Sequence, residues 1–351
     1  MHMADALLTP AVAITMYAAS GAAAGLSAHK LKLDENTHKL PTMAVTAALV
    51  FAGQMINYTI PGTGSSGHMC GGMMLSALLG PQAGFLSMVV ILAIQCLFFA
   101  DGGLMALGAN CWNMAFYGCF VGYYLIWRPI MRGSWFSRMD AKAAMRTKIV
   151  TASILGCIVT LQLGAFSVVV ETSLSGIAEL PFGAFCALMQ PIHLAIGLVE
   201  GLITAAVLIF VYESRPEMLQ EVGSSAAQGK TSVKKTVIIL AIVAVIVAGA
   251  LSLFASSNPD GLEWALFGNT DEGYGENMAL DEENYGVQSG VADAAASVQE
   301  KTAFLPDYAF PDSDSAAGTT VSGLLGAGIV AAVAVGICLL GGFFRKKKAN
   351  K

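Results

Sequence analysis

Charged residues are scarce in this chain, and their scarcity excludes a soluble globular protein. Asp, Glu, Lys and Arg make up 12% of the 351 residues, whereas hydrophobic residues make up 55% and the mean hydropathy is +0.64. A soluble domain carries roughly 25% charged residues. Because so few polar side chains cannot cover a globular surface, lipid must cover the rest. The composition therefore predicts a membrane protein.

Several motifs of enzymes and redox proteins are also missing. No GxxxxGK[ST] occurs, so the chain lacks a phosphate-binding loop of that kind for ATP hydrolysis. HExxH is absent and no nucleophile–base pair is evident, which argues against a membrane metalloenzyme. The seven cysteines show no CxxC spacing, so we expect small buried hydrophobes and no disulfide framework. The first segment has Asp5 and no Lys or Arg, unlike a signal peptide.

Long apolar runs are what the chain has instead. A hydrocarbon core of about 30 Å needs roughly 20 apolar residues in a helix. One run, over 68–80, is too short to span that core. The runs that are long enough lie near 5–28, 40–60, 81–100, 104–127, 149–170, 182–212, 236–255 and 321–344. We therefore predict an all-α polytopic membrane protein with about eight spanning helices and one short half-helix after a re-entrant loop.

The connections between these runs differ in charge. The connection 257–320 holds thirteen acidic residues against a single Lys301. By the positive-inside rule, the basic connections face the cytoplasm, so the N-terminus and the acidic loop lie outside and the C-terminus inside. The basic connections contain Lys30, Lys32, Lys39, Arg128, Arg132, Arg138, Lys142, Arg146, Lys148, Arg215, Lys230, Lys234, Lys235 and Arg345 to Lys348.

This topology makes His68 unusual. The chain must cross from outside to inside between Ile60 and Pro81, yet the helix available over 68–79 is only about 18 Å long. The stretch PGTGSSG must therefore carry irregular backbone into the membrane, which is tolerated only inside protein or beside a cavity. The sequence predicts that His68 lies inside the protein, at the N-terminus of the half-helix. A simpler alternative is that His68 bonds a carbonyl and stiffens the loop.

A second histidine directly follows the start of the chain. The free amine of Met1, the amide nitrogen of His2 and its imidazole Nδ1 can close adjoining chelate rings on one ion. Such a planar set of nitrogens selects Ni(II) or Cu(II), and Co(II) is compatible with a related geometry. His68 is the natural fourth ligand, because it and Met1 both belong to the outer half. The alternative for His2 is an ordinary disordered start.

Other polar residues occur where they could orient these ligands. Carboxylates and amides commonly hold ligating histidines, although the same residue types also join membrane helices. Asn110 and Asn113 share a helix face, as do His193 and Glu200. The full set of candidates that support the ligands is Asn57, Ser66, Asp101, Asn110, Asn113, His193 and Glu200.

Several of these motifs are typical of one transporter family. The segments are MH at the start, FAGQMIN at 51–57, PGTGSSGHMCGGMMLSALLGPQAGF at 61–85, ADGGLMALGANCWNM at 100–114 and HLAIGLVEGLITA at 193–205. Over roughly 1–215 the chain resembles the CbiM/NikM-type substrate-binding component of energy-coupling-factor cobalt/nickel ABC transporters. PDGLEWAL at 259–266 and PDYAF at 306–310 resemble the fused small component, CbiN/NikN.

The resemblance carries implications for domains, ligands and partners. It implies a metal-binding component at 1–215, a cytoplasmic linker at 216–235, a two-helix domain at 236–344 with an acidic outer loop at 257–320, and a basic tail at 345–351. It implies the same ligands, Met1, His2 and His68, and an outer loop that assists loading. Where the family usually reads MHIPDG, this chain has Ala4 and Ala6, which leaves the shape of the N-terminal loop open.

The resemblance also implies the energy source. Transport of Co²⁺ or Ni²⁺ would depend on a membrane coupling subunit (CbiQ/NikQ-like) and ATP-binding subunits (CbiO/NikO-like), with no organic cofactor and no nucleic acid. The metal would supply cobalamin synthesis or nickel enzymes, and the sequence does not distinguish the two metals. Small residues around Gly21 and Gly25 would let the coupling subunit approach, or else pack within the chain. A stand-alone secondary carrier is the alternative function.

Overall fold

The computed structural model describes residues 1–31, 40–177, 179–222, 231–278, 280, 285–311, 315 and 317–349, without the side chains of Leu40 and of 337–349. The helices are α1 (Pro10–Lys30), α2 (Leu40–Gln54), α3 (Gly72–Leu79), α4 (Pro81–Phe99), α5 (Leu107–Asn110), the π-helix η4 (Cys111–Trp127), α6 (Arg128–Arg132), α7 (Ala141–Leu174), α8 (Phe182–Ser214), α9 (Val233–Gly249), α10 (Gly261–Phe267), α11 (Gly290–Thr302) and α12 (Ala317–Ala349). Short 3₁₀ turns lie at η1 (Asp5–Leu7), η5 (Pro216–Met218), η6 (Leu251–Phe254) and η7 (Pro306–Tyr308).

Five helices of the described chain are long and apolar enough to cross a membrane, namely α1, α4, α7, α8 and α12. They correspond to five of the eight predicted runs. The other three runs form shorter or mixed elements. α2 ends at Gln54 and α9 ends at Gly249, while the run 104–127 forms α5 and then η4. The membrane class is therefore confirmed, and the count of eight spans stays a prediction.

The segment between α2 and α4 differs from the prediction in two ways. It contains a small antiparallel hairpin, β1 (Tyr58–Ile60) with β2 (Ser65–Gly67), so the described chain is not wholly helical. The half-helix α3 begins at Gly72, four residues after His68, so the prediction that His68 starts that helix is wrong. Gly71 adopts a positive φ of 85°, which turns the chain into α3. His68 lies in the connecting loop.

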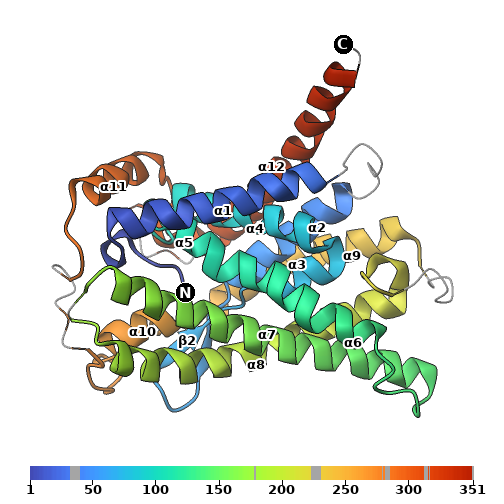
Figure 1. Ribbon diagram of the computed structural model, residues 1–351, viewed down its shortest axis with the longest axis horizontal. Helices are drawn as coiled ribbons and strands as arrows, with labels where there is room; N and C mark the ends of the chain where they lie inside the picture. Colours follow the sequence, from blue (N-terminus) through green and yellow to red (C-terminus); the bar gives the residue numbers. More distant parts are fainter. Residues whose placement is uncertain are drawn as a thin grey trace.

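The helices pack lengthwise around the central α3 (Figure 1). Residues from Gly72 to Leu78 in α3 are all buried. α7 and α8 lie side by side, and Gly197 and Gly201 of α8 allow this close approach because glycine has no side chain. A Cβ would lie 2.9 Å from an α7 Cα atom at Gly197 and 2.6 Å from another at Gly201. On the opposite flank, α9 and α12 pack against α2. The C-terminal helices thus join the same bundle.

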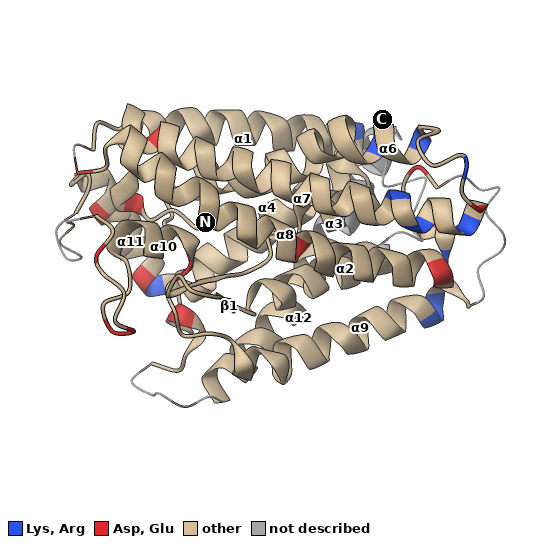
Figure 2. Ribbon diagram, turned by 90° about the horizontal axis from the view of Figure 1, so that it is seen from below, with Lys and Arg blue, Asp and Glu red and all other residues tan. Residues whose placement is uncertain are grey.

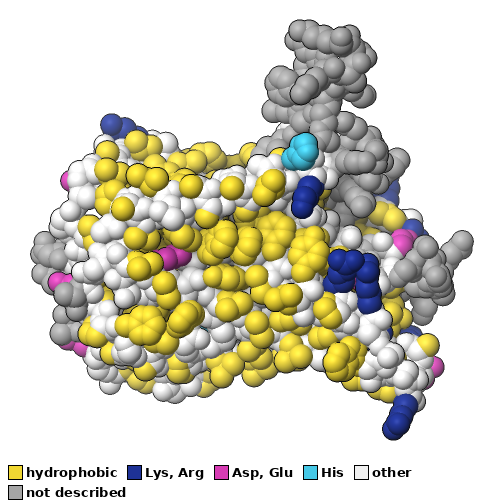
Figure 3. All heavy atoms as spheres, in the orientation of Figure 1, with side chains coloured by type: hydrophobic (Ala, Val, Ile, Leu, Met, Phe, Trp, Pro, Cys, Tyr) yellow, Lys and Arg dark blue, Asp and Glu magenta, His cyan; other side chains and the backbone are white. Residues whose placement is uncertain are grey.

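Charge is separated along the bundle. Nearly all Lys and Arg lie at one end of the helices, and Asp and Glu gather near α10 and α11 at the other (Figure 2). Between the ends, one face is largely hydrophobic (Figure 3). Exposed apolar side chains of the long helices include Leu155 and Phe166 of α7 and Leu198 of α8. Of the residues used to predict topology, Lys32, Lys39, Lys230, Asp281, Glu282, Glu283, Asp312 and Asp314 lie outside the described residues, as do the side chains of Arg345 to Lys348.

The first part of the predicted linker is packed against the bundle. The backbone N–H of Gln220 donates to the Ala77 carbonyl at the end of α3 (2.8 Å), and its side chain donates to Leu78 O (3.2 Å). Leu219 and Val222 are buried. Because α9 begins at Val233, the connection between two packed elements is shorter than 216–235, and 223–230 lie outside the described residues. All six described cysteines are free, and five are buried, as expected for small apolar residues.

Candidate metal centre

The N-terminus is held inside the acidic end of the bundle. Met1 is 6% exposed, and its methyl group lies against Gly164 of α7. The backbone of Met3 is gripped from both sides, because its N–H donates to Asn110 Oδ1 (2.8 Å) and its carbonyl accepts from Asn110 Nδ2 (3.2 Å) and from the backbone N–H of Gly103 (2.9 Å). Two residues of the ADGGLMALGAN motif thus fix the position of the amine.

The amine of Met1 faces Asp260, the N-cap of α10. The distance from the amine to Asp260 Oδ2 is 2.9 Å, and the same oxygen lies 3.8 Å from His68 Nε2. The other oxygen, Oδ1, accepts the N–H groups of Leu262 (2.8 Å) and Glu263 (2.9 Å), which caps the helix. Burial raises the pKa of Asp260, but the ammonium group and His68 outweigh it and lower the pKa well below its usual range. One carboxylate oxygen therefore lies between two expected metal ligands.

His2 and His68 meet beside this pair. Their rings stack with centroids 5.3 Å apart. His2 Nδ1 lies 3.1 Å from Asp101 Oδ1, and its Nε2 lies 3.2 Å from Gln95 Oε1. Burial is the main cause that lowers the pKa of His2 to about 4, with Asp101 opposing it. The imidazole is therefore neutral at physiological pH, the form that binds a metal ion.

The loop that carries His68 is clamped by a buried carboxylate. Glu200 of α8 accepts the backbone N–H groups of Cys70 (2.7 Å) and Gly71 (2.8 Å). The Cys70 carbonyl accepts a hydrogen bond from Gln54 Nε2 (2.7 Å). Within this loop, His68 Nδ1 lies 3.1 Å from Met69 O, so Nε2 is turned toward Asp260.

The structure brings together Met1, His2 and His68, which come from the N-terminus and the post-hairpin loop. Asp101 contacts His2, Asn110 holds Met3, and Glu200 holds the loop after His68. The remaining candidates contact other parts of the site. Asn113 donates to Glu171 and Met3, the carbonyl of Asn57 accepts from Ser256, Ser66 contacts the PDGLE segment, and His193 lines an adjacent cavity.

Sequence reasoning missed three residues of the site. Asp260 lies between the ligands, Gln95 touches His2 and extends to Gln54 (2.9 Å), and Tyr308 donates from its hydroxyl to Asp101 Oδ2 (2.6 Å). A lone amide within the apolar run ILAIQCLFF was a usable signal for Gln95. Asp260 and Tyr308 lie in motifs that the family resemblance already used, PDGLEWAL and PDYAF.

The PDGLE segment, residues 259–263, docks on strand β2. The N–H of Ser66 donates to the Pro259 carbonyl (2.8 Å), and the Ser66 hydroxyl donates to Asn258 O (2.7 Å). Within this segment, Asp260 lies next to the Met1 amine and Gly261 lies against α8. A Cβ at Gly261 would lie 2.9 Å from Ile196 Cδ1 and 3.2 Å from His193 Cε1. A glycine here allows the segment to approach the metal centre.

We expect Gly261→Ala to weaken this docking. The added methyl group would overpack the contact with Ile196 and His193, at a cost of about 1–3 kcal/mol. The melting temperature of the purified protein should fall. The matched control is Gly275→Ala, at a glycine of the same loop where no atom lies within 4 Å of an added Cβ. This substitution should leave the melting temperature unchanged. Equal melting temperatures for both variants would contradict this contact.

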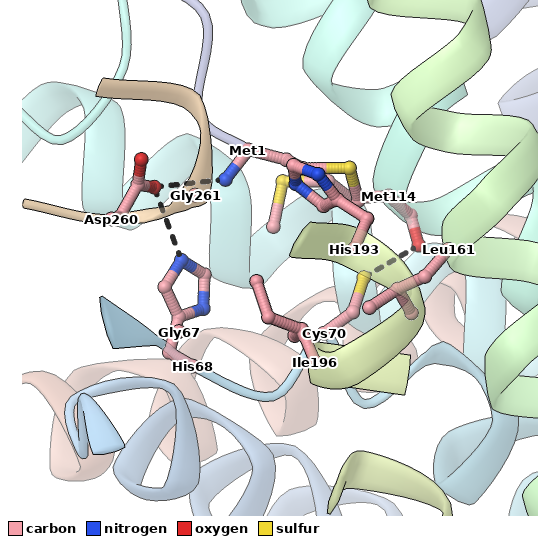
Figure 4. Close-up of a pocket in the computed structure, with 10 residues that line it drawn as sticks. All are labelled: Met1, Gly67, His68, Cys70, Met114, Leu161, His193, Ile196, Asp260 and Gly261. Carbon is pink, nitrogen blue, oxygen red and sulfur yellow. Dashed lines mark hydrogen bonds and ion pairs between the residues drawn. The ribbon is translucent and has the colours of Figure 1, made fainter. Parts of the chain in front are cut away.

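Two cavities adjoin the ligands. The larger, about 720 Å³, is the vestibule, lined by His2 and His68 and by acidic residues including Asp101, Asp260 and Asp307. The smaller, about 10 Å³, is lined by Met1, Gly67, His68, Cys70, Met114, Leu161, His193, Ile196, Asp260 and Gly261 (Figure 4). Among the described residues no three His, Cys, Asp or Glu side chains form a ready metal cluster. A metal site at this position would therefore depend on backbone nitrogen atoms, the amine of Met1 and the amide of His2.

Comparison with known proteins identifies the chain. The family model for the cobalt uptake substrate-specific transmembrane region, CbiM, matches residues 2–218. The chain belongs to the CbiM family. A PDGLE domain follows at 234–341, so the CbiM region is fused to a NikN-like domain. This fused arrangement agrees with the docking of the PDGLE segment on β2.

Relatives with the same arrangement are metal transport proteins. A putative fused nickel transport protein NikMN of Archaeoglobus fulgidus is 36% identical over 95% of this chain and 96% of its own length. The fused nickel transport protein NikMN of Rhodobacter capsulatus is 31% identical over 95% of each chain. A crystal structure of a truncated transition metal transporter superposes with a TM-score of 0.51 and 30% identity, covering 61% of this chain and 99% of that one.

Proposed function

We propose that this CbiM-family chain is the substrate-capture membrane component of an ATP-driven energy-coupling-factor importer for Co²⁺ or Ni²⁺. The observation that carries the proposal is the convergence of the Met1 amine, His2 and His68 at one buried position. The two nickel transport relatives and the cobalt uptake family model described above support this class of substrate.

Ligand exchange is the chemistry that this arrangement supports. The amine of Met1 pairs with Asp260, and His2 pairs with Asp101, so each expected ligand is held by a carboxylate. An incoming cation would displace one proton from the Met1 ammonium group and one from the backbone amide of His2, and would bind the nitrogens so freed. Nitrogen-rich coordination favours nickel and cobalt over magnesium and calcium, which prefer oxygen. The two carboxylates would remain nearby and balance part of the cation's charge.

The charge separation supports one orientation in the membrane. Basic side chains favour the cytoplasmic side, and Figure 2 places the α10–α11 end opposite them. The N-terminus, the metal centre and the vestibule would then face outside, and the C-terminus would lie inside. A vestibule lined by Asp101, Asp260 and Asp307 would attract divalent cations toward His2.

Helix α1 offers a surface for the coupling subunit. Gly21 and Gly25 are exposed, and no heavy atom lies within 4 Å of a Cβ built at either position, so these two glycines do not pack within the described chain. Small residues on an exposed membrane helix permit close approach of another helix. We propose that this face contacts the membrane coupling subunit, which in turn binds the ATPases.

Replacing Gly21 and Gly25 with Leu is expected to abolish co-purification of the coupling subunit, because the larger side chains would hold the helices apart. The readout is an affinity pull-down of the tagged chain with its coexpressed partners. Gly328→Leu, at another open glycine, serves as the control and should retain the complex. Assembly that persists in the double variant would remove α1 as the docking face.

Uptake of ⁶³Ni or ⁵⁷Co by intact cells tests the energy source. We expect accumulation to require the ATPase subunits, because no phosphate-binding GxxxxGK[ST] loop occurs in the chain. Accumulation against a gradient in cells that lack those subunits would instead support a secondary carrier. A catalytically inactive ATPase variant provides the matched control, since it preserves the complex.

A further inference from the structure

His193 has the arrangement of a metal ligand. It lies in α8, is 1% exposed, and its Nδ1 is 2.8 Å from the carbonyl oxygen of Met189. Because a carbonyl only accepts, Nδ1 carries the proton, and Nε2 of the neutral ring has a free lone pair. No donor in the described structure reaches Nε2.

Metal-ligating histidines usually have this arrangement. Their second ring nitrogen donates to a carbonyl or carboxylate, which fixes the tautomer and turns the free nitrogen toward the ion. His68 shows the same pattern, with Nδ1 3.1 Å from Met69 O. Both rings line the small cavity of about 10 Å³, which has room for roughly one water or one dehydrated ion. Two imidazoles held in the same way thus border one ion-sized space (Figure 4).

The small cavity lies on the helix side of the metal centre. It is lined by Met1, Met114 of η4, Leu161 of α7 and His193 of α8, whereas His2 and Asp101 line only the vestibule. His68 and Asp260 border both spaces. An ion that leaves the His2 ring while still bound to His68 would therefore enter the small cavity, where His193 is the next imidazole.

We propose that His193 Nε2 is a metal ligand at an inner transit position, where it and His68 hold the Co²⁺ or Ni²⁺ ion released by the N-terminal chelate. The proposal rests on the proposed function and adds a second metal-binding position to it. Imidazole suits both metals. Two imidazoles hold an ion less tightly than four chelating nitrogens, and a weaker inner site allows the ion to continue inward. A structural histidine would instead have a donor at Nε2.

The test uses the full-length chain in detergent with Ni²⁺ alone. His2→Ala removes the outer chelate, and X-ray absorption with one equivalent of Ni²⁺ should then count two imidazoles. Adding His193→Gln should remove one imidazole and lower the affinity at least tenfold. The glutamine amide can still donate to the Met189 carbonyl, which protects the fold. Adding His29→Gln, at the far end of α1, should change neither value.

The outcomes separate this inference from the proposed function. If the unmodified chain binds neither Ni²⁺ nor Co²⁺, the proposed function fails and the inner site fails with it. If the unmodified chain binds tightly but the His2→Ala protein shows one imidazole, or the same affinity with and without His193→Gln, only the inner site is overturned. The imidazole count in the His2→Ala protein needs no change at His193, so the test stands even if the His193 variant misfolds.

Discussion

His2→Ala is expected to lower the affinity of the purified chain for Ni²⁺ by at least about 100-fold, because losing a ligand costs more than the roughly 10–100-fold lost with an outer partner. The substitution removes an imidazole that burial keeps neutral, with a pKa of about 4. It also breaks the chelate that joins the amine to the ring. Isothermal titration calorimetry with Ni²⁺ and Co²⁺ provides the measurement.

One additional residue ahead of Met1 should have a similar effect without altering any side chain. The amine would move away from Asp260, and the side chain of Met1 would have to leave its seat against Gly164. His29→Ala, which changes an exposed histidine on α1, is the control. Undiminished binding of both metals by the His2 variant and by the extended chain would refute the amine–imidazole site and the function built on it.

Asp260→Asn is expected to destabilise the metal-free protein and to slow metal uptake at least tenfold. The Met1 ammonium group, buried with a side chain only 4% exposed, would lose its counter-ion. Removing one partner of a buried pair costs about 3–5 kcal/mol, and the partial exposure of Asp260 reduces this to about 1–3 kcal/mol. The melting temperature should fall in the absence of metal and recover in part when Ni²⁺ replaces the proton on the amine.

The control for Asp260 is Asp271→Asn, which removes an exposed carboxylate from the same loop. It changes the net charge of the loop equally and touches no ligand, so melting temperature and uptake should stay at the values of the unmodified chain. If both variants slowed uptake alike, the overall acidity of the loop would be the cause, and the ion pair with Met1 would have no special part.

The sequence predicted the elements that depend on local pattern. Apolar runs identified all five helices of the described chain that are long enough to cross a membrane, since a spanning helix needs roughly 20 consecutive apolar residues. The hairpin was missed because strands of three residues, one of them Ser-Ser-Gly, are too short to show a recognisable alternation. The start of α3 was placed too early, because the turn at Gly71 is a backbone conformation that an apolar run does not reveal.

The candidate ligands could be named from the chain because His2 and His68 occur in unusual local settings, one next to the amine and one in a glycine-rich break. Their partners could not, because those partners come from distant parts of the chain. Asp260 is 259 positions from Met1, and Tyr308 is 207 positions from Asp101. No local pattern states which of the many acidic residues in 257–320 will reach the amine.

The sequence by itself determined the membrane class, the separation of charge and the presence of ligand-type residues, since these properties follow from composition and spacing. Only the tertiary structure decided that Ser66 would seat the PDGLE segment, that Asp260 would lie between the amine and His68, and that His193 would border the same cavity. Such contacts depend on how helices and loops far apart in the chain pack together, and packing is a property of the whole fold.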